Sequence, residues 1–144
     1  MKKYILSIII LFTTFQSYSY IGYSVNTSAI RSVTVEKLGG KLVIYFRRQG
    51  VYDSIESDDV LAGIDVKPQY RSEVVALIKS LLSSTRVYDI SIYDNTPNTG
   101  KIMLDKINLA KELLQRGWVK KFRIEIDNAD DRASFNEYYN DLME

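Results

Sequence analysis

The sequence predicts a small α+β domain in which helices pack on one mostly antiparallel sheet. Runs of alternating apolar residues flank a Gly-Gly pair at 39–40, which is typical of a β-hairpin near the N-terminus. Apolar residues recur at helical spacing over 70–83 and again over 128–142. Alternating segments separate these helices, and no repeat or low-complexity linker divides residues 20–144, so we expect one domain.

The first 19 residues are typical of a secretory signal peptide. Residues 2–3 are lysines, residues 4–15 form an uncharged apolar run, and residues 17–19 place serines at the −3 and −1 positions of a cleavage site. We expect cleavage before Tyr20, which leaves 125 of the 144 residues in the periplasm or outside the cell. A membrane anchor is the alternative, but the run is shorter than the roughly 20 residues that span a bilayer, and no later segment is long enough. The Lys-Lys start and the Ile-rich composition fit a bacterial protein.

The composition excludes several kinds of chemistry. The chain has no histidine and no cysteine, which excludes imidazole bases, thiolate nucleophiles and His/Cys metal sites. A carboxylate pair, a Ser-Lys pair or a metal held by oxygen atoms would remain for an enzyme, and no spacing in the chain points to one. We therefore predict a protein that is not an enzyme, with no cofactor and no metal site.

The charge of the chain favours neither nucleic acid nor a membrane surface as a partner. The sequence has 19 basic and 18 acidic residues, and removal of the two leader lysines leaves 17 basic residues and a net charge of −1. Because no cysteine can form a disulfide, stability is expected to come from the core and from hydrogen bonds.

The first part of the exported chain is predicted to form strands. Residues 20–26 form a short strand, residues 31–38 form a second, and residues 41–47 return from the Gly-Gly turn as a third. The third strand is apolar on both faces, which is typical of a central strand that is covered on both sides.

Residues 49–68 are weakly patterned and predict a solvated loop, with one short strand over 61–66. The acidic side chains of this segment favour a soluble loop over a cation site, because the register and central glycine of a calcium loop are absent. These acids are Asp53, Glu56, Asp58 and Asp59.

A helix over 70–83 is followed by a strand over 86–94. Residues 102–117 favour a second helix, and a strand over 101–108 is the alternative because Ile102 and Leu104 alternate. Val119 to Asp127 alternates as a strand. The last helix is expected to start at Asn128 as its N-cap and to bury a stripe formed by Phe135, Tyr138, Tyr139 and Leu142.

Two sets of residues are candidates for binding. The polar turn that ends the strand over 86–94 carries Asp94, Asn95 and Asn98, and we expect these three side chains to bind a ligand. The exported chain also has nine tyrosines, and tyrosine offers a flat ring and a hydroxyl that suit sugars and protein partners. The basic pair Arg47-Arg48 could contact an acidic partner or a carboxylated sugar. Arg47, Arg48 and Tyr52 are assigned to a partner surface.

Residues 22–93 resemble the small exported OB-fold proteins related to the B subunits of subtilase- and pertussis-like toxins. The resemblance rests on SVTVEKLGGKLVIYF, YRSEVVALIKSLLSS and VYDISIYD, which match a strand pair with a glycine turn, a helix and a further strand. It implies an OB fold and glycan binding by a ring oligomer. The cysteine pair usual in that family is absent, the tail after Leu109 is additional, and no glycan-contact residue is carried over.

Residues 66–127 resemble the OmpA-like peptidoglycan-binding domains through VKPQYRSEVVALIKSLL and ISIYDNTPNTG. That family holds diaminopimelate with an Asp of the turn and an Arg of the next helix. Here Pro97 and Leu109 stand at those positions, so peptidoglycan binding is not implied.

These observations predict an exported, non-catalytic recognition protein that binds a glycan or a protein. The alternative is a periplasmic immunity or inhibitor protein that blocks a toxin or hydrolase. A homo-oligomer is left open, and the sequence does not identify the ligand.

Overall fold

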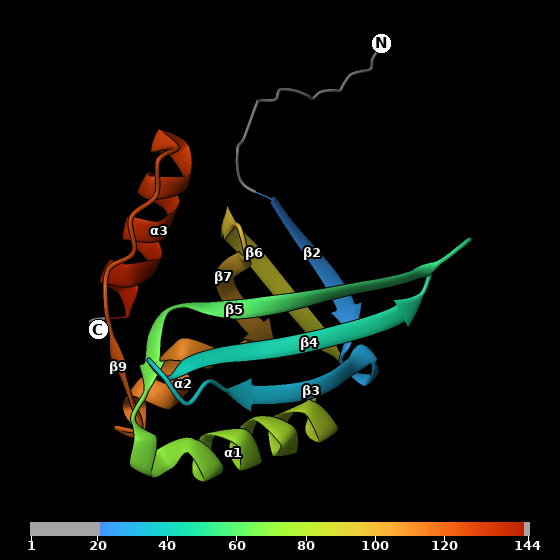
Figure 1. Cartoon of the computed structure of the whole chain (residues 1–144), viewed down its shortest axis with the longest axis horizontal. Coiled ribbons are helices and arrows are strands. Elements are labelled where there is room, and N and C mark those ends of the chain that lie inside the picture. The colour runs from blue at the N-terminus through green and yellow to red at the C-terminus, as the bar shows by residue number, and fades with distance from the viewer. Residues whose placement is uncertain (1–20, 143–144) are drawn as a thin grey trace.

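The described residues, 21–142, contain eight strands in one mixed sheet with three α-helices (Figure 1). This computed structural model therefore confirms the α+β class. The signal peptide predicted over residues 1–19 lies outside the described residues. In chain order the elements are β2 (Ile21–Asn26), η1 (Thr27–Ala29), β3 (Ile30–Val35), β4 (Lys41–Gln49), β5 (Ser54–Val66), η2 (Pro68–Tyr70), α1 (Arg71–Ser84), β6 (Val87–Asn95), β7 (Asn98–Leu104), β8 (Ile107–Asn108), α2 (Leu109–Gln115), β9 (Val119–Lys121) and α3 (Ala129–Asp141).

The strands follow the order β2-β6-β7-β5-β4-β3, with β8 added to β7 and β9 added to β5. All pairs are antiparallel except β5 with β7. The two ends of this order, β2 and β3, follow each other in the chain and are joined only by η1. Thr27 in that connection donates its backbone N–H to Arg86 O and its hydroxyl to Thr85 O, at 2.9 and 2.6 Å. The connection is thereby held against the start of β6.

The predicted N-terminal hairpin is confirmed. Gly39 and Gly40 both have positive φ, 84° and 71°, and the backbone N–H of Glu36 donates to Lys41 O across the turn. One face of β4 is buried in the core, whereas Val43 and Tyr45 on the other face are half-buried. The second face of β4 is therefore only partly covered.

The solvated loop predicted before residue 61 is wrong, because β5 begins at Ser54 and runs unbroken to Val66. Residues 54–60 pair with β4 residue by residue. Carboxylates occupy both faces of this stretch: Glu56 and Asp58 are exposed, and Asp59 is buried. An acid at an inward position conceals the alternation from which a strand would be predicted.

The helix favoured over 102–117 is wrong in its first half, where the alternative strand is found. β7 buries Gly100, Ile102 and Leu104 on one face and pairs with β6. A Cβ atom at Gly100 would clash with the carbonyl oxygen of Ser91 on β6, so the close approach of these strands requires glycine. Helix α2 begins only at Leu109.

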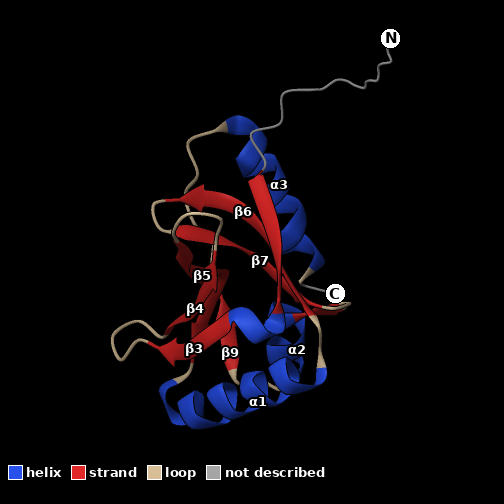
Figure 2. Ribbon diagram, turned by 90° about the vertical axis from the view of Figure 1, so that its right-hand side faces the viewer, coloured by secondary structure: helices blue, strands red, loops and turns tan. Residues whose placement is uncertain are grey.

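The helices lie at different sides of the sheet (Figure 2). Helix α1 lies beneath the strands, buries Val74 and Ile78, and packs on β3 and η1. Helix α3 has the predicted cap, since the Asn128 side chain accepts hydrogen bonds from the first-turn backbone. It packs through Phe135 and Tyr138, and the Tyr138 hydroxyl donates to Ala62 O at 2.7 Å. No helix among the described residues is long and apolar enough to cross a membrane.

The strand predicted over 119–127 is shorter than expected, since β9 ends at Lys121. Its pairing with β5 stops at Ile64, and the last backbone bond joins the Phe122 N–H to Gly63 O. Beyond this point the chain follows α3, and the Arg132 guanidinium donates to the carbonyls of Ile126 and Asp127. Residues 122–128 are thus held by a helix rather than by a neighbouring strand.

Candidate functional site

The outer part of the β4–β5 hairpin projects from the body of the protein (Figure 1). Strand β4 last pairs with β3 at Phe46, and β5 first pairs with β7 at Asp59. Between these points and the turn, β4 and β5 pair only with each other among the described strands. We call residues 47–56 the arm.

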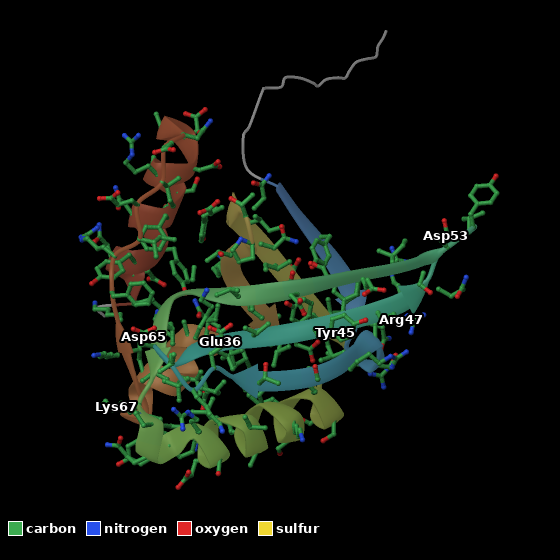
Figure 3. All side chains as sticks on the ribbon, in the orientation of Figure 1. Glu36, Tyr45, Arg47, Asp53, Asp65 and Lys67 are labelled. Atoms are coloured by element: carbon green, nitrogen blue, oxygen red, sulfur yellow. The ribbon has the colours of Figure 1, made fainter. Side chains whose placement is uncertain are left out.

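The two faces of the arm differ in chemistry. Residues that pair across two antiparallel strands share a face, so Arg47 lies with Glu56 on the outer face, and Arg48 lies with Ile55 on the inner face. The outer face is linked by polar contacts: the Tyr45 hydroxyl donates to Glu56 Oε1 at 3.1 Å, and Arg47 donates to Ser54 Oγ at 3.3 Å. Figure 3 shows Tyr45 and Arg47 on β4 and Asp53 toward the far end of the arm.

The tip of the arm is apolar and solvent-exposed. Val51 and Tyr52 are 90% and 92% exposed. The turn is closed by a hydrogen bond from the Gly50 N–H to Asp53 O at 2.8 Å. The structure therefore places Arg47, Arg48 and Tyr52, the predicted partner surface, on one projecting element.

A pocket of about 250 Å³ lies between the arm and β2, and we call it the arm pocket. The rings of Tyr23 and Phe46 stand 5.2 Å apart in its wall, and Ile55 is 43% exposed beside them. The lining residues are Tyr23, Ser24, Val25, Phe46, Arg48, Ile55, Glu56 and Ser57.

A buried carboxylate lies next to this pocket. Asp59 is fully buried, and its Oδ2 accepts hydrogen bonds from the hydroxyls of Tyr23 and Tyr88 at 2.5 and 2.7 Å. Its Oδ1 accepts from Ser57 Oγ at 2.9 Å, and Asn98 donates its amide to the same hydroxyl at 2.8 Å. We call these five residues the Asp59 network.

The Asp59 network joins strands rather than forming an open reaction centre. Burial, together with the hydrogen bond to Asp59, raises the pKa of the Tyr23 phenol above its ordinary value. Burial likewise raises the pKa of Tyr88, and the Asp59 charge adds to the shift. Both phenols therefore hold their protons and act as donors, which ties β2, β5 and β6 together.

The predicted ligand residues are divided by the structure. Asp94 and Asn95 line a second pocket of about 300 Å³, which we call the turn pocket, whereas Asn98 belongs to the Asp59 network. The other lining residues of the turn pocket are Ile92, Tyr93, Thr96, Glu125, Ile126, Asp127, Asn128 and Asp131.

The turn pocket is rich in hydrogen-bond acceptors. Four carboxylates and two amide side chains line it, and no Lys or Arg does. Asp94 Oδ1 already accepts from the backbone and hydroxyl of Thr96, both at 3.4 Å. Within residues 21–142 no group of three or more acidic side chains is arranged to hold a metal ion. The chemistry of this pocket suits hydroxyl or cationic groups.

Several of these residues were not identified from the sequence. Val51 and Ile55 lay in a segment predicted as a loop, in which Gly50 is the residue that could have indicated a hairpin turn. Glu125 and Asp127 come to the turn pocket from about thirty residues further along the chain, and no local pattern predicts that meeting.

Comparison with known proteins leaves the family open. No known protein-family model matches this chain, and no curated protein matches it.

Proposed function

We propose that this is an exported, non-catalytic recognition protein that binds a protein partner through the arm. The observation that carries the proposal is the tip, where Val51 and Tyr52 are almost fully exposed on a two-stranded ribbon. Exposed apolar side chains that gather on one element are typical of protein-binding surfaces. Tyrosine and arginine are also enriched among the residues that contribute most to binding energy.

The proposal extends to the scaffold that carries the arm. We take it to be OB-like, with β2 and β3 together acting as one bent first strand that pairs with β6 at one end and β4 at the other. The helix α1 between β5 and β6, and the parallel pair of β5 and β7, fit that arrangement. An OmpA-like domain would have a helix after the turn at 96–97, where this chain has β7.

An inhibitor or immunity protein is the form of this function that the shape of the arm favours. The arm is narrow, because the backbones of two paired strands lie only about 5 Å apart. Tyr52 is exposed at the end of the arm that is farthest from the body of the protein. Such an element can enter the cleft of a hydrolase or toxin.

Site-specific cross-linking tests the proposal. A photoreactive phenylalanine analogue replaces Tyr52 in one variant and Leu38 in a matched control, because Leu38 is 90% exposed in the turn at the opposite end of β4. In the organism that produces the protein, the variant at position 52 is expected to give one discrete cross-linked protein that the variant at position 38 lacks. Equal products from both positions, or none from either, would overturn the proposal.

A glycan is the second candidate ligand, and the turn pocket is the observation that favours it. Carboxylate and amide oxygens next to Tyr93 suit the hydroxyls of a neutral sugar, and four carboxylates would repel a carboxylated one. A glycan array tests this with the Asp94→Asn variant beside the unchanged protein. Binding of neutral glycans that the variant loses would support it, and an array without signal would exclude it.

A further inference from the structure

We propose that the gap between β2 and the arm takes up an extended, acidic segment of the protein partner, which adds to the sheet as a strand. One apolar side chain of that segment would fill the arm pocket, and a neighbouring carboxylate would pair with Arg48. This inference rests on the proposed function, since it names the kind of partner that the arm recognises.

Two strand edges without partners border the gap. Strand β2 pairs with β6 alone, and β4 beyond Phe46 pairs with β5 alone among the described strands. Each strand therefore keeps one row of backbone N–H and C=O groups for a further strand. Addition of an extended peptide to such an edge is a common mode of peptide recognition.

The arm pocket selects for an apolar side chain. Its walls are mostly rings and aliphatic groups, from Tyr23, Phe46 and Ile55. At about 250 Å³ it is smaller than the roughly 300–1,000 Å³ of pockets that enclose small-molecule ligands. A single branched or aromatic side chain of a peptide is the better fit. The hydroxyl of Tyr23 is held by Asp59, so this wall is fixed before the peptide binds.

The charge of the inner face selects for an acidic segment. Arg48 is exposed, lines the arm pocket and makes no salt bridge with a described residue. Two acidic residues lie nearby. Asp58 lies on the outer face of the arm. Glu56 also lines the arm pocket, but its carboxylate accepts a hydrogen bond from the Tyr45 hydroxyl on the outer face. A carboxylate from the partner would therefore meet an unpaired guanidinium, which binds carboxylates by two parallel hydrogen bonds.

Peptide binding tests the inference, with fluorescence anisotropy on protein purified after expression of the full chain. The first peptide is labelled Asp-Val-Glu-Phe-Asp-Val-Glu-Val, and the second has lysine at each acidic position. We expect the acidic peptide to bind at least about tenfold more tightly than the basic one, since the pairing with Arg48 is charge-assisted. Equal affinities, or no binding of the acidic peptide at about 1 mM, would overturn the inference.

Neighbouring arginines provide a matched pair of variants. Arg48→Gln is expected to weaken the acidic peptide about tenfold, whereas Arg47→Gln on the outer face should change its affinity by less than about twofold. Equal losses in both variants would mean attraction by general charge and would overturn the inference. Neither side chain is buried, so both variants should keep the melting temperature of the unchanged protein.

Hydrogen exchange identifies where the peptide lies. Strand addition should slow exchange of the amides in β2 and in residues 47–49, and protection confined to the tip would overturn it. A change of oligomeric state in Arg48→Gln without any peptide binding would instead show that a second copy occupies the gap, which also overturns the inference. If these tests fail while the cross-link at position 52 persists, the arm still binds a partner but by another surface.

Discussion

The two halves of β5 have opposite environments although they form one continuous strand. Residues 59–66 lie between β4 and the strands β7 and β9, and almost all of them are buried. Residues 54–58 pair with β4 alone and are mostly exposed. Asp58 and Asp59 mark the change, since the first faces solvent and the second is enclosed by three hydrogen-bond donors.

This difference should separate the residues that stabilise the fold from those of the proposed binding surface. The inner half contacts the core and the Asp59 network, so changes there should affect folding. The outer half contributes few buried groups, so its side chains can be replaced with little loss of stability and can serve the proposed binding of a partner. The following predictions test this separation.

The largest effect is expected from the two neighbouring aspartates. Asp59→Ala leaves the buried hydroxyl of Tyr88 and the half-buried hydroxyls of Tyr23 and Ser57 without their acceptor, which should lower the free energy of unfolding by about 3–5 kcal/mol. Asp58→Ala should change it by less than about 0.5 kcal/mol. Urea unfolding followed by circular dichroism measures both. Similar values for the two variants would contradict the separation.

Aliphatic side chains of the two halves should differ in the same way. Leu61 is fully buried, and Leu61→Ala should lower the free energy of unfolding by about 2–5 kcal/mol through the cavity that it leaves. Ile55→Ala on the arm should lower it by less than about 1 kcal/mol, because Ile55 keeps contact with water. Thermal unfolding of both variants in parallel provides the comparison. A loss at Ile55 as large as that at Leu61 would place the arm within the folding core.

Alkaline pH should weaken the folded domain through the phenols of the Asp59 network. The pKa values of Tyr88 and Tyr23 are raised in the folded state, so their contribution is complete below the ordinary value of 10.0 and is lost as pH rises above it. The buried Tyr88 phenol should remove about 1.4 kcal/mol of stability per pH unit in that range, and the half-buried Tyr23 phenol should remove less because solvent screens it. Tyr88→Phe removes one of them and should reduce the slope accordingly. An unchanged slope in this variant, measured by urea unfolding between pH 9 and 11, would contradict the role of the network.

The smallest effect on stability is expected at the tip. Replacement of Val51 and Tyr52 by serine removes no buried contact and should change the free energy of unfolding by less than about 0.5 kcal/mol. The same double variant should abolish the discrete cross-link when the photoreactive residue is moved to Gln49. A stable double variant that retains the cross-link would show that the tip does not contribute to binding.

The predictability of the fold followed the environment of each segment. The Gly-Gly hairpin, the helix predicted over 70–83 and observed over 71–84, and the capped last helix were predicted because each carries a local signal in its turn, its cap or its periodicity. Residues 102–104 were assigned to the start of a helix because Met103 and Ile107 add helical spacing to a strand pattern, and only the pairing of this segment with β6 distinguishes the two. The start of β5 was not predicted because Asp59 places a carboxylate at an inward position of the strand. The two tyrosine hydroxyls that bind this carboxylate come from segments distant in sequence.

The sequence by itself determined the class of the domain, the hairpin and the two long helices, because these depend on turn chemistry and on periodicity within one segment. It also determined that imidazole and thiol chemistry are excluded. Only the tertiary structure decided that Arg48 rather than Arg47 faces β2, that Asn98 supports a buried carboxylate, and that Asp94 meets the segment after β9. Those arrangements depend on the register and pairing of strands far apart in the chain, and no local pattern specifies them.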